Sequence, residues 1–394
     1  MEILITITQI ISLALFVWAA IATSYMFMYS VFGLLYTERR KKVNIKESES
    51  PRIAVIIPAY KEDSVIVKTA ESALRQSYPV GKYQVLVVAD SLQRSTLYKL
   101  HNLPLNVLEV QFESSTKAKA LNAALNYLPE NFDMVVVLDS DNIIQTDFLT
   151  KMSDAFVQGH RAIQGHRTAK NSNTAYSLLD AISEEINNHI FCKGQQYLGM
   201  SSRLTGSGMG FEYQLFKQLM SEINAVGGFD KELELKLISS DAKIHYVPSA
   251  IIYDEKVSKS EVMVKQRSRW ISSQFHYMKK YLPSGIVRLF KNQDVDYFNK
   301  SVQLAIPPRM FMVLIVFFGT LLSVASYSNA MMYAWLILFS IYILAFVIAF
   351  PRKFVGKQLF QLVIAIPNAF FKLVSSIPSM FHANKKFIHT PHES

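Results

Sequence analysis

The chain has 394 residues, of which 50% are hydrophobic and only 18% are charged, and its formal net charge is +10. Soluble domains carry about 25% charged residues, so the composition excludes a disordered chain and disfavours a purely soluble enzyme. Because the basic residues lie beside long apolar stretches, we expect a membrane protein with a basic cytoplasmic face and no nucleic-acid partner. The single cysteine, Cys192, excludes an internal disulfide and a multi-cysteine zinc site.

The N-terminal stretch contains no charged residue from position 3 to position 37. It is longer than the roughly 20 apolar residues that a membrane-crossing helix needs. A basic run over 39–42 follows it, and this order is the reverse of that in a cleaved signal peptide. We therefore predict an uncleaved transmembrane anchor over 1–37, with the basic run in the cytoplasm and the N-terminus outside.

Residues 51–281 have an ordinary globular composition and are predicted to form a cytoplasmic domain. Continuous apolar runs indicate buried strands, and apolar residues at helical spacing indicate helices between them. The predicted elements are strands over 53–57, 85–88, 107–112 and 134–138, and helices over 65–75 and 116–127. This alternation predicts an α/β fold with a parallel sheet, whose ligands bind at the carboxyl ends of the strands.

Candidate binding residues follow three of these strands at the point where each ends. They are Pro58, Ala59, Tyr60 and Glu62 after the first strand, Asp90 after the second, and Asp139 and Asp141 after the last. Asp139 and Asp141 form a DxD pair, which can hold Mg²⁺ or Mn²⁺ together with substrate phosphates. The alternative is that these aspartates cap helices, and Asp90 leaves a choice between capping and binding a base or ribose.

Two further segments place cations where they can meet phosphate. Lys117 opens a predicted helix, whose N-terminus also attracts anions; a solvated lysine is the alternative. Gln266, Arg269 and Trp270 belong to the segment QRSRW, which joins guanidinium donors suited to phosphate with an aromatic platform for a sugar. The same segment also suits an amphipathic helix at a membrane surface.

Beyond the globular domain the sequence becomes apolar again. Residues 282–306 mix charged and aromatic residues and predict an interfacial helix. Residues 309–350 contain two apolar runs and predict two transmembrane helices joined by a short outside turn. The last region, 351–394, is predicted to be basic and cytoplasmic. Its apolar part, 359–381, is predicted to lie in the interface, with a further span as the alternative.

These motifs, in this order, resemble those of the membrane-bound family 2 glycosyltransferases, which include the synthases of hyaluronan, cellulose, chitin oligosaccharide and poly-N-acetylglucosamine. The resemblance extends over 52–270 and to the flanking apolar segments. It rests on the nucleotide-binding opening 55–62, Asp90, the stretch 116–122, the DxD pair and the QxxRW motif. It implies a GT-A-like, Rossmann-type nucleotide-sugar domain with N-terminal and C-terminal transmembrane helices and interfacial amphipathic helices.

The resemblance also suggests where the catalytic base lies. Gapless alignment of 233–237 on the family's pattern puts Asp230 on the base, although Phe229 stands where the family has a glutamate. A slip of two residues would make Glu232 the base instead. The turn 206–208, made of Gly206, Ser207 and Gly208, resembles the family's acceptor-side glycine motif, with a plain tight turn as the alternative.

The implied reaction is an inverting, metal-dependent transfer from a nucleotide-sugar, with UDP expected, to a glycan or lipid-linked acceptor. In it Asp90 and 58–62 hold the nucleoside, Lys117, Arg269 and the DxD pair with Mg²⁺ or Mn²⁺ hold the diphosphate, and Trp270 faces the acceptor. The expected location is an inner (plasma) membrane, crossed several times. Polymer synthesis, a single addition and a non-catalytic scaffold stay open, as do the sugar and the oligomeric state.

Overall fold

The computed structural model describes residues 2–38, 49–324 and 329–356, and these contain an eight-stranded sheet in the order β3-β2-β1-β4-β7-β6-β8-β5. The strands are β1 (Ile53–Tyr60), β2 (Tyr83–Asp90), β3 (Asn106–Val110), β4 (Met134–Val137), β5 (Ile143–Ile144), β6 (Ala162–Ala169), β7 (Met209–Glu212) and β8 (Ile244–Asp254). The predicted parallel arrangement is correct for β1 to β4. The other half is mixed, because β7 is antiparallel to both β4 and β6.

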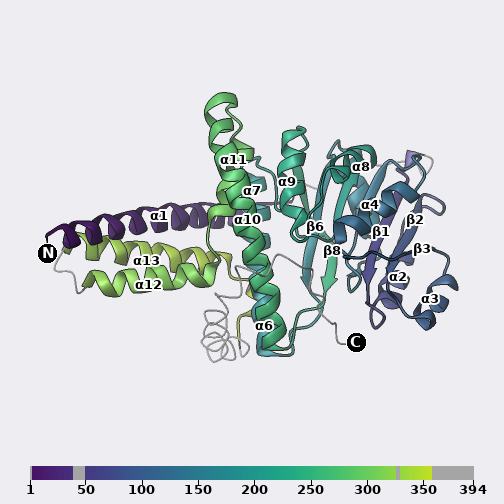
Figure 1. The fold of residues 1–394 in the computed structure, drawn as a ribbon, viewed down its shortest axis with the longest axis horizontal. Helices are drawn as coiled ribbons and strands as arrows, with labels where there is room; N and C mark the ends of the chain where they lie inside the picture. The colour runs from purple at the N-terminus through teal and green to yellow at the C-terminus, as the bar shows by residue number, and fades with distance from the viewer. Residues whose placement is uncertain (1, 39–48, 325–328, 357–394) are drawn as a thin grey trace.

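Helices cover both faces of this sheet (Figure 1). Ala54 and Ile56 of β1 face a core formed with α4, α8 and α9, whereas Ile53, Val55 and Ile57 face a core formed with α2 and α5. Burial on both faces explains why the strand is a continuous apolar run. The helices of this part are α2 (Ile66–Leu74), α3 (Arg94–His101), α4 (Lys117–Tyr127), α5 (Phe148–Val157), α8 (Tyr213–Ser221) and α9 (Phe229–Ser239).

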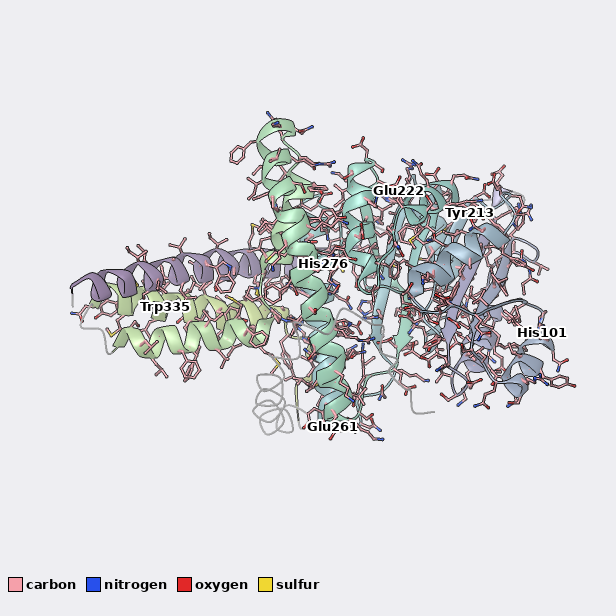
Figure 2. The ribbon with its side chains drawn as sticks, viewed as in Figure 1. His101, Tyr213, Glu222, Glu261, His276 and Trp335 are labelled. Atoms are coloured by element: carbon pink, nitrogen blue, oxygen red, sulfur yellow. The ribbon has the colours of Figure 1, made fainter. Side chains whose placement is uncertain are left out.

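Three apolar helices project from one side of this domain as a bundle (Figure 1). They are α1 (Glu2–Leu35), α12 (Arg309–Val324) and α13 (Asn329–Ala349). Figure 2 labels Trp335 in this bundle, and its ring lies 5.1 Å from that of Phe16. Two described helices, Ile10–Leu35 and Asn329–Ala349, are long and apolar enough to cross a membrane. The helix Val295–Ala305 and α12, which are bent by 70° relative to each other, would form a third span if they are counted together.

The junction between the bundle and the sheet domain is made by helices that cross the bundle direction (Figure 1). They are α6 (Ala175–Asn187), its π-helical continuation η2 (Asn188–Gly194), α7 (Gln195–Tyr197), α10 (Ser260–Asn292) and α11 (Val295–Ala305). The stretch 282–306, which we expect to be one helix, contains the end of α10 and the separate helix α11. Asp294 accepts a hydrogen bond from Tyr297 N–H and so caps a new helix. A short 3₁₀ turn, Arg352–Phe354, follows α13. The predicted interfacial segment 359–381 lies outside the described residues.

Candidate active site

A cavity of about 540 Å³ runs from the carboxyl ends of β1, β2 and β4 to the start of the apolar bundle. Most of the predicted site residues line it: Pro58, Ala59, Tyr60, Glu62, Asp90, Lys117, Asp139, Asp141, Gly206, Asp230, Gln266, Arg269 and Trp270. Among the described residues, Ser207, Gly208 and Glu232 do not. Chain segments that are distant in the sequence therefore meet in one space, as expected for strand ends in an open α/β sheet.

The ends of β1 and β2 form one wall of the cavity. Tyr60 and Asp90 are register partners across the two strands. The residues that follow, Lys61 and Ser91, both have positive φ values, 57° and 58°, so both chains turn sharply where the strands stop. Lys61 N–H donates to the Asp90 carbonyl at 3.1 Å, which fixes the two turns together. Burial, with repulsion from Asp139, raises the pKa of the neighbouring Glu62 to about 8.

The loop after β4 is held by the turn that precedes β7. Asp139 N–H donates to Ser207 Oγ at 2.8 Å, and Gly208 N–H donates to the Val137 carbonyl at 2.9 Å. Ser207 is fully buried. In the turn 206–208, which we expect to bind the acceptor, Ser207 and Gly208 thus lie behind the DxD loop and do not line the cavity. Only Gly206 reaches the cavity, where its carbonyl accepts a hydrogen bond from Lys117 Nζ at 2.7 Å.

A third carboxylate joins the DxD pair. Carboxylate oxygens of Asp139, Asp141 and Asp254 all lie within 4.8 Å of one another. Asp254 ends β8, and the antiparallel pairing of β5 with β8 brings it beside the DxD loop. Asn142 fixes the arrangement, because its side-chain amide donates to Asp141 at 3.2 Å and to Asp254 at 3.0 Å. Three oxygen donors of this kind suit a hard divalent cation such as Mg²⁺ or Mn²⁺.

Basic side chains pair directly with two of these carboxylates. Lys117 Nζ forms an ion pair with Asp139, and Lys256 Nζ lies 2.7 Å from Asp254. Burial opposes ionisation of Asp254, but the charges of Lys256 and Arg167 outweigh it, so the pKa of this carboxyl lies below its usual range. Lys256 and Arg167 both also pair with Glu184 of α6. Asp254 is thus held as an anionic oxygen ligand beside the DxD pair.

Asp230 and Glu232 begin the same helix, α9, but they face different surroundings. Asp230 lines the cavity, whereas Glu232 accepts hydrogen bonds from Lys280 Nζ at 2.7 Å and Tyr281 OH at 3.1 Å. Residues two apart on a helix point roughly 200° apart, so only one of the pair can face the cavity. Glu232 instead ties α9 to α10. Gly228 precedes this helix with φ of +69°, directly against Ser273 of α10.

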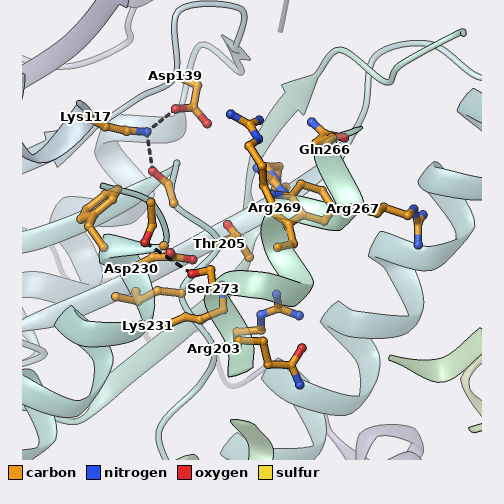
Figure 3. A pocket seen from close by; sticks show the side chains of 18 of the residues that line it. Lys117, Asp139, Arg203, Thr205, Asp230, Lys231, Gln266, Arg267, Arg269 and Ser273 are labelled. Carbon is orange, nitrogen blue, oxygen red and sulfur yellow. Dashed lines mark hydrogen bonds and ion pairs between the residues drawn. The ribbon is translucent and has the colours of Figure 1, made fainter. Parts of the chain in front are cut away.

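The QxxRW segment lies on α10 and faces the cavity from the other side (Figure 3). Gln266, Arg267, Arg269 and Trp270 all contribute to the lining. The Arg267 guanidinium pairs with Asp180 of α6 at 2.9 Å, which anchors the helix. Trp270 stays 42% exposed, so its indole offers a free face to a ligand in the cavity.

Three functional candidates escaped the sequence analysis. Asp254 is the last residue of β8, and its approach to the DxD pair depends on the short strand β5, which no sequence pattern marks. Arg203 and Arg309 line the cavity near the apolar bundle. They lie in a loop and at the start of the apolar helix α12, and no local pattern in the sequence marks either of them.

Comparison with known proteins identifies the family. Residues 51–273 match the model of a family described as glycosyltransferase like family 2, which covers more than half of the chain. The protein therefore belongs to this family of glycosyltransferases. Over its length it is also similar in fold to a solved mannosyltransferase from Pyrobaculum calidifontis, with a TM-score of 0.57, 16% identity, and coverage of 93% of this chain and 97% of that one. The mixed sheet with its covering helices is accordingly a GT-A-like fold.

Curated relatives are similar in sequence to a smaller part of the chain. The Bacillus subtilis protein named Probable glycosyltransferase YdaM is 22% identical over 289 residues, which are 69% of this chain and 67% of that protein. An N-acetylglucosaminyltransferase of Sinorhizobium fredii is 24% identical, with 67% of each chain covered. A beta-monoglucosyldiacylglycerol synthase of Trichormus variabilis is 22% identical over 60% of this chain and 52% of its own. The chain thus matches from about half to two thirds of these relatives' length.

Proposed function

We propose that this protein is a metal-dependent, inverting glycosyltransferase that acts at a membrane. It moves a sugar from a nucleotide-sugar, with UDP as the expected nucleotide, to a hydroxyl group of a glycan or lipid-linked acceptor. One observation carries the proposal: the carboxylates of Asp139, Asp141 and Asp254 share a single cavity with Asp230 and Arg269. That cavity therefore offers a place for a cation, a base for an acceptor and a donor to a leaving phosphate.

The donor lies over the ends of the strands. Asp90 and Tyr60 bind the nucleoside in the wall that β1 and β2 form. Asp139, Asp141 and Asp254 would hold Mg²⁺ or Mn²⁺, which supplies charge neutralisation for the diphosphate when bound. The solved mannosyltransferase of similar fold is a complex with GDP-Man and Mn²⁺, which is consistent with this use of the cavity. Arg269 donates charge-assisted hydrogen bonds to the phosphate oxygens.

The transfer is a single displacement. The acceptor oxygen bonds to the anomeric carbon while the bond from that carbon to the β-phosphate oxygen breaks, and its electron pair leaves with the UDP. Asp230 accepts the proton of the acceptor hydroxyl as the new bond forms. Because the oxygen attacks the face opposite the leaving group, the configuration at that carbon inverts. Trp270 gives the acceptor sugar an apolar platform.

The expected location is an inner (plasma) membrane, with the sheet domain on the cytoplasmic side. Support comes from the two helices that are long and apolar enough to cross a bilayer, Ile10–Leu35 and Asn329–Ala349. The basic run 39–42, directly after the first of them, favours a cytoplasmic domain by the positive-inside rule. The cavity reaches Met26 of α1 and Met310 of α12, so an acceptor can approach from the membrane side.

The test is release of the nucleoside diphosphate, UDP or GDP, by the full chain in detergent. A panel of UDP-sugars, with GDP-mannose beside it, is assayed with and without Mn²⁺, with a membrane lipid extract as acceptor. We expect release that needs Mn²⁺ and that Asp230→Asn lowers about 100-fold or more while UDP still binds. Full activity in this variant would reject Asp230 as the base. UDP binding without release from any sugar would instead indicate a non-catalytic sensor. Product length then separates polymer synthesis from a single addition.

A further inference from the structure

The end of the cavity nearest the apolar bundle has a chemical character of its own. We call this the membrane end and define it by Arg203 and Arg309 with the apolar residues beside them. Those apolar residues are Met26 of α1, Phe191 of η2, and Ile306 and Met310 around the start of α12. The membrane end thus places two guanidinium groups beside an apolar surface, where α1 and α12 meet the sheet domain.

The hydrogen-bond donors of the Arg309 side chain are only partly paired within the protein. Its Nη2 donates to the Ser183 carbonyl and to Ser183 Oγ, both at 2.7 Å. Its Nη1 is buried and has no hydrogen-bond partner. A buried donor without a partner costs free energy, and the cost is larger for a charged group. Arg309 is also the first residue of α12, where the helix dipole adds positive potential.

The carboxylates near the membrane end make their direct contacts with groups other than Arg203 and Arg309. Asp180 pairs with Arg267, and Glu234 accepts a hydrogen bond from Leu204 N–H. Burial raises the pKa of Glu234, which favours its neutral form. In the part of the chain that the structure describes, neither defining arginine has a carboxylate within ion-pair distance. The charges of Arg203 and Arg309 are therefore not neutralised by a direct ion pair, and Figure 3 shows Arg203 far from Asp139 across the cavity.

We propose that the membrane end binds the phosphate of a lipid-linked acceptor, with Arg203 and Arg309 as its ligands. This inference rests on the proposed transfer reaction and narrows its acceptor. Guanidinium groups bind phosphate oxygens bidentately, and both arginines line this end of the cavity. The apolar residues accommodate the first carbons of the lipid chain. The phosphate thereby anchors the acceptor while its sugar hydroxyl lies at Asp230.

The test measures binding rather than turnover. The full chain in a neutral detergent is titrated calorimetrically with farnesyl monophosphate, farnesol or inorganic phosphate. We expect farnesyl monophosphate to bind about tenfold or more tightly than either of the others. Arg309→Gln and Arg203→Gln should each raise its Kd about tenfold. Arg288→Gln is the matched control, because Arg288 lies on α10 at the junction and pairs with Asp294 outside the cavity. It should leave the Kd within about twofold.

Each outcome decides the proposal. Equal affinity for farnesol and farnesyl monophosphate would overturn it, and so would unchanged binding in Arg203→Gln and Arg309→Gln. Inorganic phosphate binding as tightly as the lipid phosphate would indicate a soluble anion and overturn the lipid assignment. UDP binding with Mn²⁺ checks that each variant is folded, and Arg203→Gln decides the matter if Arg309→Gln fails this check. Failure of every nucleotide-sugar to react would refute the proposed function but leave these binding results interpretable.

Discussion

The two ends of the cavity carry opposite charge. Where the strands end, Asp139, Asp141 and Asp254 gather acidic oxygens, whereas the membrane end presents Arg203 and Arg309. A cation with a diphosphate suits the first end, which we call the donor end, and an anion suits the second. In the proposed reaction, donor and acceptor therefore enter from different sides, with the catalytic groups between them. The opposite charges of the two ends would then keep the diphosphate of the donor apart from the phosphate of the proposed acceptor.

The ends also differ in how the chain builds them. The donor end is made by residues that directly follow buried strands, and neighbouring parallel strands align them almost automatically. The membrane end is made by contacts between distant segments, such as that of Arg309 with Ser183, 126 residues apart. Experiments on the donor end should therefore give the larger effects on catalysis.

Removing the third carboxylate should have the largest effect at the donor end. Asp254→Asn takes one charge from the cation site, and we expect UDP release to fall about 100-fold or more and the apparent Mn²⁺ affinity about tenfold. The measurement is UDP release titrated with Mn²⁺. Asp241→Asn is the control, because Asp241 is exposed in a turn with φ of 54°, which asparagine tolerates. An unchanged Mn²⁺ dependence would mean that Asp254 is only a structural partner of Lys256 and that it does not belong to the cation site of the donor end.

Displacing the base should have the next largest effect. A methyl group on Gly228 would overlap Ser273 Oγ, and the φ of +69° is itself unfavourable for alanine. Gly228→Ala should therefore shift Asp230 and lower kcat about tenfold to 100-fold. Adding Ser273→Ala should recover part of this loss in the same UDP-release assay.

Gly199→Ala is the matched control for Gly228→Ala. Gly199 has φ of +72° with nothing within 4 Å, so alanine there meets the same backbone strain without a clash. It should leave kcat unchanged. Equal losses in both variants would mean that strain rather than the position of Asp230 governs the rate.

The donor end was predictable because its signals are local. Val55 to Ile57 and 134–138 are apolar runs buried on both faces, and their strand-end aspartates need only the sheet to bring them together. Asp254 shows where this reasoning stops. Its approach to the DxD loop depends on Asn142, 112 residues away, and on the pairing of β5 with β8. A two-residue strand such as β5 leaves no recognisable pattern in the sequence.

The choice between Asp230 and Glu232 also needed the structure. Both lie in the first turn of one helix, and helical spacing says only that they point in different directions. The packing of α9 against α10 decides which of them faces the cavity. For the membrane end, the sequence indicated apolar spans but not which side chains gather above them, because that depends on the crossing of α6, α10 and α12.

Neutralising Glu232 should separate structure from catalysis. Glu232→Gln weakens the charge-assisted hydrogen bonds to Lys280 and Tyr281, so we expect a loss of about 1–2 kcal/mol in the free energy of unfolding. UDP release should stay within about threefold of the parent, since Glu232 does not reach the cavity. Thermal unfolding in detergent and the release assay measure the two quantities. A loss of activity as large as that in Asp230→Asn would transfer the role of base to Glu232.

The smallest expected effect is a change in the pH dependence of stability. It concerns a pair of histidines at the end of the sheet opposite the donor end. His160 and His245 stack with ring centroids 3.7 Å apart, and His245 lies at the start of β8, whose far end is Asp254. Burial, with the charge of His160, lowers the pKa of His245 from 6.5 to about 4. The folded state therefore resists protonation that the unfolded state accepts.

The stability from this pair should be fully present above about pH 6.5 and should decrease as the pH falls toward 4, by about 1 kcal/mol at about pH 5.5. His245→Phe keeps the stacking without a titrating group, so its unfolding temperature should depend less on pH. His101→Gln, at an exposed histidine, is the control. If the unfolding temperature of His245→Phe kept the full pH dependence, the acid sensitivity would originate elsewhere, and the charged groups of the cavity would be tested next. If the slope flattens, any pH dependence of UDP release that persists in His245→Phe belongs to the cavity.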